Sequence, residues 1–259
     1  MPATGNSSLM SYSLSIRAYA GGFSFLVHSV ASGQVIIEEK VPSYAGESET
    51  ENFRRLLAHP RLGGREYERI RFLSNAPVTQ IPLDEFRRED IVAIYRQVFS
   101  DSVIRAEDLA VQILPHLEVV CIYHLPVATE RALREVFPQA TIQNYNACLI
   151  EFAATHSQGM RSSDYGGGYR GSVAFHAVVS DAELLIVAIS RGRLLYTNTF
   201  ACDNDADRLY FLMSVWRLLE MDEQYDQCNI YGEAPVFLKS VRDFIFSVRN
   251  NRLPPLINI

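Results

Sequence analysis

The sequence is poor in the features that mark secreted, metal-binding and membrane proteins. It has four cysteines in 259 residues, and no two are close enough to suggest a disulfide framework or a zinc site. They stand at Cys121, Cys148, Cys202 and Cys228. The longest apolar runs, such as Leu117 to Leu125, fall short of the roughly 20 residues that cross a bilayer. Because residues 1–11 also lack signal-peptide features, we expect a cytoplasmic protein without a membrane span.

Positive charge is also scarce. The chain has 24 Lys and Arg against 30 Asp and Glu, which gives a net charge of -6 at pH 7. Binding to nucleic acid or to an anionic membrane relies on a surplus of Lys and Arg, so we expect neither as a partner. The 48% of hydrophobic residues supply a core for one large domain or two smaller ones, which excludes a disordered chain.

The first strong pattern lies between residues 14 and 40. Apolar and polar residues alternate there, and the turn-forming segments 20–22 and 31–34 divide the alternation into three runs. This pattern predicts a three-stranded antiparallel meander. An acidic linker follows, and the helical spacing of Phe53, Leu56 and Leu57 then predicts an amphipathic helix.

The central region mixes helices and strands. One-sided apolar residues predict a helix over 83–99 with Asp84 as its cap. Residues 117–156 alternate between strand and helix, which is typical of βαβ units and a largely parallel sheet. The Gly- and Ser-rich segment 159–171 then predicts a linker.

After this linker the opening pattern returns. Residues 173–200 predict a second meander, which superposes on the first at an offset of 159 residues. The offset pairs Ala18 with Ala177, Leu26 with Leu185 and Gly33 with Gly192. We interpret this as an internal duplication. Further helices are predicted at 206–219 and 235–248, with a strand between them that ends near Gly232.

The predicted boundaries follow from the duplication. They are a flexible N-terminus at 1–12, a first half at 13–158, a linker at 159–171 and a second, shorter half at 172–259. Each half would open with three strands and a helix. The fold class is therefore α/β, with duplicated βββαβα-type halves and mixed sheets.

This layout resembles the actin-like ATPase superfamily, whose halves have a ribonuclease H-like fold. More closely, the chain resembles a Bacteroidetes family of unknown function, DUF3822, also expected to have the actin-like fold. Two segments carry that likeness: Leu14-Ser15-Ile16-Arg17 leading into Gly22-Phe23-Ser24-Phe25, and Asp207-Arg208-Leu209-Tyr210-Phe211-Leu212 leading to Val215-Trp216. The resemblance covers nearly the whole chain and implies the fold but no known activity.

The resemblance also implies where a nucleotide site would be. Members that hydrolyse ATP hold it between the halves, with the first hairpin of each half around the phosphates and an acidic residue ending each first strand. Here those two positions hold Arg17 and His176. We therefore expect no catalytic residues, no metal ligands and no resident cofactor, with ATP and Mg²⁺ as the alternative. The candidate cleft residues are Arg17, Gly21, Gly22, His176, Ser180, Asp181, Gly232 and Glu233.

Other motifs carry little chemistry. The glycines of Gly166-x-Gly168-x-x-Gly171 lack the preceding strand and following helix of a dinucleotide site. Asp203, Asp205 and Asp207 lack the later ligands of a calcium loop, so they indicate a helix N-terminus.

Three functions remain open. The loss of the carboxylates favours a catalytically inactive binding or scaffold module for a protein partner, docked on the cleft or on a sheet edge. An ATP-binding protein or ATPase switch with divergent phosphate loops is the alternative, and the sequence does not decide whether the protein is an enzyme. A small-molecule sensor that uses the same cleft is the third.

Overall fold

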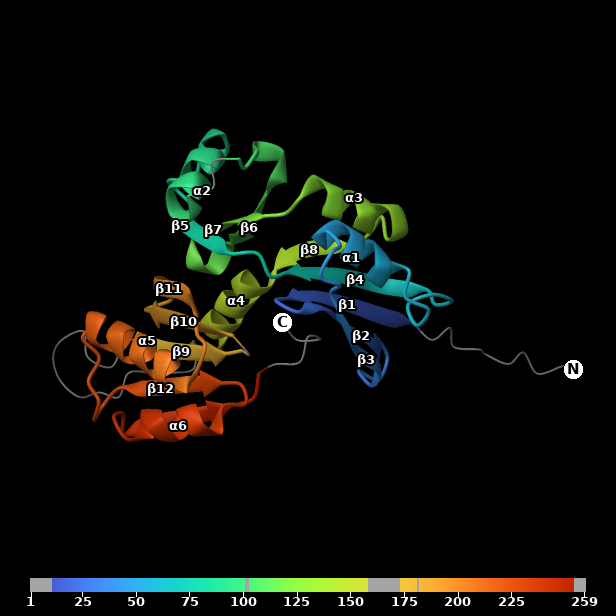
Figure 1. Ribbon diagram of the computed structural model, residues 1–259. Helices are drawn as coiled ribbons and strands as arrows, with labels where there is room; N and C mark the ends of the chain where they lie inside the picture. Colours follow the sequence, from blue (N-terminus) through green and yellow to red (C-terminus); the bar gives the residue numbers. More distant parts are fainter. Residues whose placement is uncertain (1–10, 101–102, 158–172, 181, 254–259) are drawn as a thin grey trace, which may run out of the picture.

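A computed structural model describes residues 11–100, 103–157, 173–180 and 182–253. Within this part the chain forms two five-stranded mixed sheets and one three-stranded sheet (Figure 1). Most of the predicted N-terminal segment and the whole 159–171 linker lie outside the described residues. The domain boundaries built on them stay predictions.

The first sheet has the strand order β3-β2-β1-β4-β8. Its strands are β1 (Tyr12–Tyr19), β2 (Gly22–Ser29), β3 (Val35–Pro42), β4 (Tyr67–Ser74) and β8 (Thr141–Asn144). The first three form an antiparallel meander, which confirms the predicted one. Strands β4 and β8 extend the sheet in parallel on the other side of β1.

The second sheet has the order β11-β10-β9-β12-β13, which matches the first sheet strand by strand. Its strands are β9 (Val173–Val179), β10 (Glu183–Ser190), β11 (Arg193–Ala201), β12 (Gln227–Tyr231) and β13 (Ser247–Asn251). Strands β9, β10 and β11 form the second predicted meander, and β12 and β13 again add in parallel. The helix after each meander also corresponds: α1 (Glu49–Leu57) in the first half and α5 (Asp205–Leu218) in the second.

The first half contains an insertion that the second half lacks. Between β4 and α3 (Val127–Val136), the first half contains β5 (Val78–Pro82), η1 (Arg88–Asp90), α2 (Ile91–Phe99), η2 (Ala106–Asp108), β6 (Leu109–Leu114), η3 (Pro115–Leu117) and β7 (Val119–His124). The second half passes from β12 to α6 (Pro235–Arg242) in three residues. The insertion explains why the second half is shorter.

Two predictions in the insertion are wrong. Strand β7 does not join a parallel sheet, because it pairs antiparallel with both β5 and β6. The helix predicted over 83–99 begins only at Ile91. Asp84 does not cap it, because backbone hydrogen bonds from Glu85 to Pro82 and from Phe86 to Leu83 hold the preceding segment in turns.

A third prediction fails at the end of the chain. The helix predicted over 235–248 ends at Arg242, and β13 follows it. The Phe246 amide donates to the Glu223 carbonyl at 2.8 Å, which draws this segment out of the helix and toward the sheet. The run Phe244-Ile245-Phe246 suits both helix and strand, so periodicity could not separate them.

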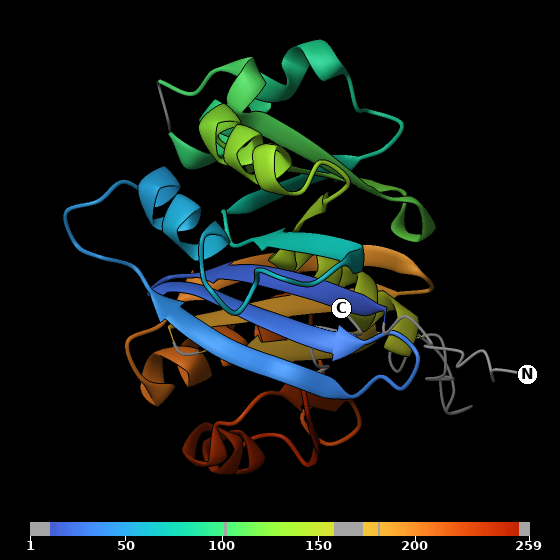
Figure 2. The same ribbon diagram turned by 90° about the vertical axis from the view of Figure 1, so that its right-hand side faces the viewer.

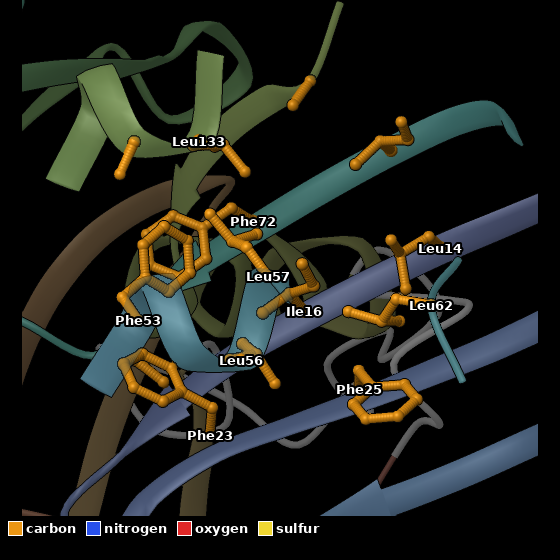
Figure 3. Close-up of a cluster of buried hydrophobic side chains, with 14 of the residues drawn as sticks. Leu14, Ile16, Phe23, Phe25, Phe53, Leu56, Leu57, Leu62, Phe72 and Leu133 are labelled. Atoms are coloured by element: carbon orange, nitrogen blue, oxygen red, sulfur yellow. The ribbon is translucent and has the colours of Figure 1, made fainter. Parts of the chain in front are cut away.

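Each sheet packs two helices of its own half against one face. In the first half, α1 and α3 cover buried strand residues, and the Phe53 ring lies 5.3 Å from Phe23 and 4.8 Å from Phe72 (Figure 3). In the second half, α5 and α6 enclose Phe175 and the fully buried Trp216. Aromatic pairs of this kind add to the stability that burial already provides.

A third core joins the halves. Helix α4 (Tyr145–Ser157) buries its first six residues together with Ala153 and Ala154, so most of the helix lies in the interior. It lies between the two sheets in Figure 1, and Figure 2 shows the first sheet in front of the second. Its neighbours include Leu73 of the first sheet and Leu185 and Val187 of the second.

Candidate functional site

Arg17 lies on β1, at the side of the first sheet that faces the second half. On β1, Ile16 and Ala18 point to the core beneath α1, so Arg17 projects from the opposite face toward α4. Its Cζ lies 3.6 Å from the centre of the Tyr145 ring, which is a cation–π geometry. Among the described residues, its buried Nε has no hydrogen-bond partner.

Glu183 supplies the opposite charge from the second half. It is the first residue of β10, and burial raises the pKa of its carboxyl group, an effect that the positive charge of Arg17 opposes. Burial likewise raises the pKa of the Tyr145 phenol, and Arg17 again acts in the other direction. Arg17, Tyr145 and Glu183 therefore form one electrostatic group, which we call the Arg17 cluster.

His176 has a different environment. Its side chain is completely buried, its Nε2 lies 2.8 Å from the Ser157 hydroxyl, and its Nδ1 lies 3.1 Å from the Tyr231 hydroxyl. Burial, and to a smaller extent the nearby His156, lowers its pKa to about 4. The imidazole is therefore neutral at pH 7, with both ring nitrogens engaged.

Arg17 and His176 do not meet. Arg17 contacts Tyr145, the first residue of α4, while His176 contacts Ser157, the last. At about 1.5 Å per residue, these ends of the helix are roughly 18 Å apart. The helix thus separates the two positions that the resemblance assigns to a common nucleotide site.

The glycines among the candidate cleft residues are explained by backbone geometry. Gly22 has φ +143°, and a Cβ there would lie 2.3 Å from the Val41 carbonyl oxygen. Gly232 has φ +110°, and a Cβ there would lie 2.6 Å from the Val179 carbonyl oxygen. Both positions need glycine for close approach, whatever else they do. Gly21 is exposed, and a Cβ there would lie 3.0 Å from the Tyr19 ring.

The second-half candidates gather near the end of β9. Gly232 lies against Val179, next to Ser180, and Glu233 is exposed beside it. The Ser180 amide donates to the Glu183 carbonyl at 3.0 Å, and Arg208 donates to the Ser180 carbonyl at 2.9 Å. Asp181 lies outside the described residues.

Sequence reasoning missed the partners of the two key residues. Tyr145, Ser157, Glu183 and Tyr231 were not singled out, although they contact Arg17 or His176 or share their electrostatics. The one available signal was the apolar stretch 147–150 of α4, because a helix with little amphipathic character is typically buried between layers.

Other potential sites have structural explanations. Asn204 caps α5 by accepting from the amides of Ala206 and Asp207, which confirms the predicted helix N-terminus. Within the described ranges, no three His, Cys, Asp or Glu side chains gather as a metal site. All four cysteines are free and buried, and burial raises the pKa of the Cys121 thiol to about 12. None of the helices that the structure describes is long and apolar enough to cross a bilayer.

Comparisons with known proteins fit this architecture. A family model described as "Protein of unknown function (DUF3822)" matches residues 5–245. The chain belongs to the DUF3822 family. No curated protein sequence matches it.

Similar solved structures identify the fold of this DUF3822 chain. A Bacteroides thetaiotaomicron protein with actin-like ATPase fold and unknown function is 25% identical, with a TM-score of 0.75 over 94% of this chain and 91% of that one. PilM, in a PilM-PilN type IV pilus biogenesis complex, is 10% identical, with a TM-score of 0.51 over 95% of this chain and 89% of that one. The predicted actin-like fold is confirmed.

Proposed function

We propose that this protein is a catalytically inactive member of the actin-like fold that works as a binding or scaffold module for another protein. The observation that carries the proposal is the use of Arg17 and His176. Both stand where the ATPases resembled would hold carboxylates, and both are committed to opposite ends of α4. An Arg on a tyrosine ring and a neutral, buried His cannot ligate Mg²⁺.

The same geometry argues for a fixed arrangement of the halves. The Arg17 cluster and the Ser157–His176–Tyr231 hydrogen bonds tie α4 to both sheets, around a continuous apolar core. Within the same fold, PilM is part of a complex with PilN, so this architecture supports protein binding. The matching strand orders support a duplication origin, and the four free, buried cysteines support a reducing, cytoplasmic setting.

A second candidate is binding of a phosphate-bearing ligand such as ATP without the usual loops. One observation favours it: the buried Nε of Arg17 lacks a partner among the described residues, and a guanidinium suits phosphate. The carboxylate of Glu183 opposes it, because it already supplies negative charge near Arg17.

Thermal unfolding with Mg-ATP, Mg-ADP and no ligand separates the two candidates. A ligand at 100 times its dissociation constant would add about 2.7 kcal/mol to stability, which is readily measured. The scaffold proposal predicts no shift for the wild type. A rise with Mg-ATP that disappears in Arg17→Ala would replace it with the ATP-binding candidate. Arg134→Ala serves as a control, because Arg134 lies on α3 and donates to the Pro138 and Ala140 carbonyls, away from all the candidate cleft residues.

A further inference from the structure

Two opposite charges lie near each other between the halves without forming an ion pair. The guanidinium of Arg17 comes from β1, and the carboxylate of Glu183 comes from the start of β10. Burial raises the pKa of the Glu183 carboxyl group, and Arg17 is close enough to oppose that rise. Among the described residues, however, neither side chain has an ion-pair or hydrogen-bond partner.

The start of α4 brings the two charges to one place. Its first residue, Tyr145, holds the guanidinium on its ring, and the amide of the next residue, Asn146, donates to the Thr199 hydroxyl at 3.2 Å. Thr199 and Glu183 share one face of the second sheet, because Ala201, two residues after Thr199, lies directly opposite Glu183. The start of α4 therefore contacts the guanidinium and lies beside the strand positions that carry the carboxylate.

Both sides of this region have unused hydrogen-bonding capacity. A guanidinium stacked on a ring uses its face and keeps the N–H donors along its edge. The buried Nε of Arg17 has no partner among the described residues, and neither does the buried hydroxyl of Thr197, which lies on the same face of β11 as Thr199. Buried polar atoms in folded proteins have hydrogen-bond partners, so these two call for one that the described residues do not supply.

The two charges select one class of ligand. A phosphate group would be attracted to Arg17, but the Glu183 carboxylate would repel it. A molecule that carries both a carboxylate and an ammonium group can instead place the carboxylate on Arg17, which binds carboxylates through two parallel hydrogen bonds, and the ammonium group on Glu183. Each charge of the protein is then paired, which offsets the cost of its burial. A free α-amino acid carries these two groups at one end of a small molecule.

We propose that the Arg17 cluster binds a free α-amino acid between the two halves, with its carboxylate on Arg17 and its ammonium group on Glu183. Tyr145 holds the guanidinium in position through its ring. The bound molecule joins β1 of the first half to β10 of the second. This inference involves neither catalysis nor a protein partner, so it is independent of the scaffold proposal.

Isothermal titration calorimetry of the wild type with each of the twenty common L-amino acids tests the class of ligand. At least one amino acid should bind. Its N-acetyl derivative keeps the carboxylate but lacks the ammonium charge, so it should bind at least about tenfold more weakly because its negative charge then faces Glu183 without compensation. If no amino acid binds, or if the N-acetyl derivative binds equally well, the proposal is wrong.

Two substitutions test whether the Arg17 cluster holds the ligand. Glu183→Gln should weaken binding of the amino acid by at least about tenfold and should reduce the preference over its N-acetyl derivative, a change in selectivity that a merely structural role would not produce. Arg17→Met should weaken binding of both molecules. The matched control is Glu135→Gln, exposed on α3, which should leave binding unchanged. Unchanged amino-acid affinity in Glu183→Gln, with circular dichroism showing the variant folded, would overturn the proposal.

Discussion

The two halves share one strand order but use the region between them differently. In the first half, Arg17 is only partly buried and stacks on the start of α4. In the second half, His176 on β9 is completely buried and hydrogen-bonds the end of α4. A shared strand order therefore does not bring the same chemistry to both halves. At both positions the side chain serves contact with α4, by a charge in one half and by a neutral network in the other.

The comparison between the halves assumes that they unfold together. Truncation of a core side chain tests this with the largest expected effect. Phe53→Ala should cost about 3–5 kcal/mol, because Phe53 is fully buried between Phe23 and Phe72. Trp216, the single tryptophan, reports on the second half. In urea unfolding of Phe53→Ala, the midpoint of the Trp216 fluorescence transition should move to a lower urea concentration, although the substituted residue lies in the first half. An unchanged tryptophan transition with an earlier circular dichroism transition would mean that the halves unfold separately.

The neutral His176 should make stability depend on pH. Its pKa is about 4 in the folded protein against 6.5 as the ordinary value, so the unfolded chain binds the extra proton first. This contribution is complete above pH 6.5 and declines as the pH falls toward 4. Between pH 7 and pH 5 it should account for a loss of about 2 kcal/mol in unfolding free energy.

The control for that effect is His176→Gln, which keeps a polar side chain but cannot titrate. Urea unfolding of the variant at pH 7 and pH 5 should show a smaller difference between the two pH values than the wild type shows. Equal pH dependence in both proteins would assign the loss to other groups.

Loss of the Ser157 hydroxyl, which bonds both His176 and the Ala153 carbonyl at the far end of α4, should have an intermediate effect. Ser157→Ala removes the partner of the His176 Nε2, and leaving a buried polar atom unsatisfied costs about 1–3 kcal/mol. Thr155→Ala is a suitable control on the same helix turn, because Thr155 is exposed and, among the described residues, its hydroxyl bonds the Glu151 carbonyl. Chemical unfolding of both variants should show the larger decrease for Ser157→Ala, and the reverse order would contradict the role of the His176 network.

The Arg17 cluster should give the smallest effect. Arg17→Met keeps much of the apolar stem and removes the charge over the Tyr145 ring, at a cost of about 1 kcal/mol. Tyr145→Phe, measured in the same unfolding series, should cost less because the ring remains. If removing the charge stabilises the protein instead, desolvation of Arg17 outweighs its contact with Tyr145.

Much of this fold could be predicted from the sequence, because strands with one buried face alternate strictly. The meanders at β1–β3 and β9–β11 follow from that alternation. Residues 83–90 and 243–248 defeated the same reasoning, since their apolar residues suit helix, turn and strand alike. Strand β6 was also missed, because its pairing with β7 comes from the insertion as a whole.

The site was predictable only in part. The repeat offset drew attention to Arg17 and His176, but it did not indicate the residues that contact them. The mostly apolar sequence of α4 does not indicate which end faces which sheet, and the Arg17 contact with Tyr145 joins residues distant in sequence. Long-range contacts of this kind depend on the packing of both halves.

We propose that the region between the halves is committed to α4 and performs no nucleotide chemistry. Phosphate release from Mg-ATP measures this most directly, with wild type and Arg17→Ala compared at the same concentration. We predict that neither protein releases phosphate above the protein-free rate. Mg²⁺-dependent turnover by the wild type that Arg17→Ala abolishes would contradict the claim.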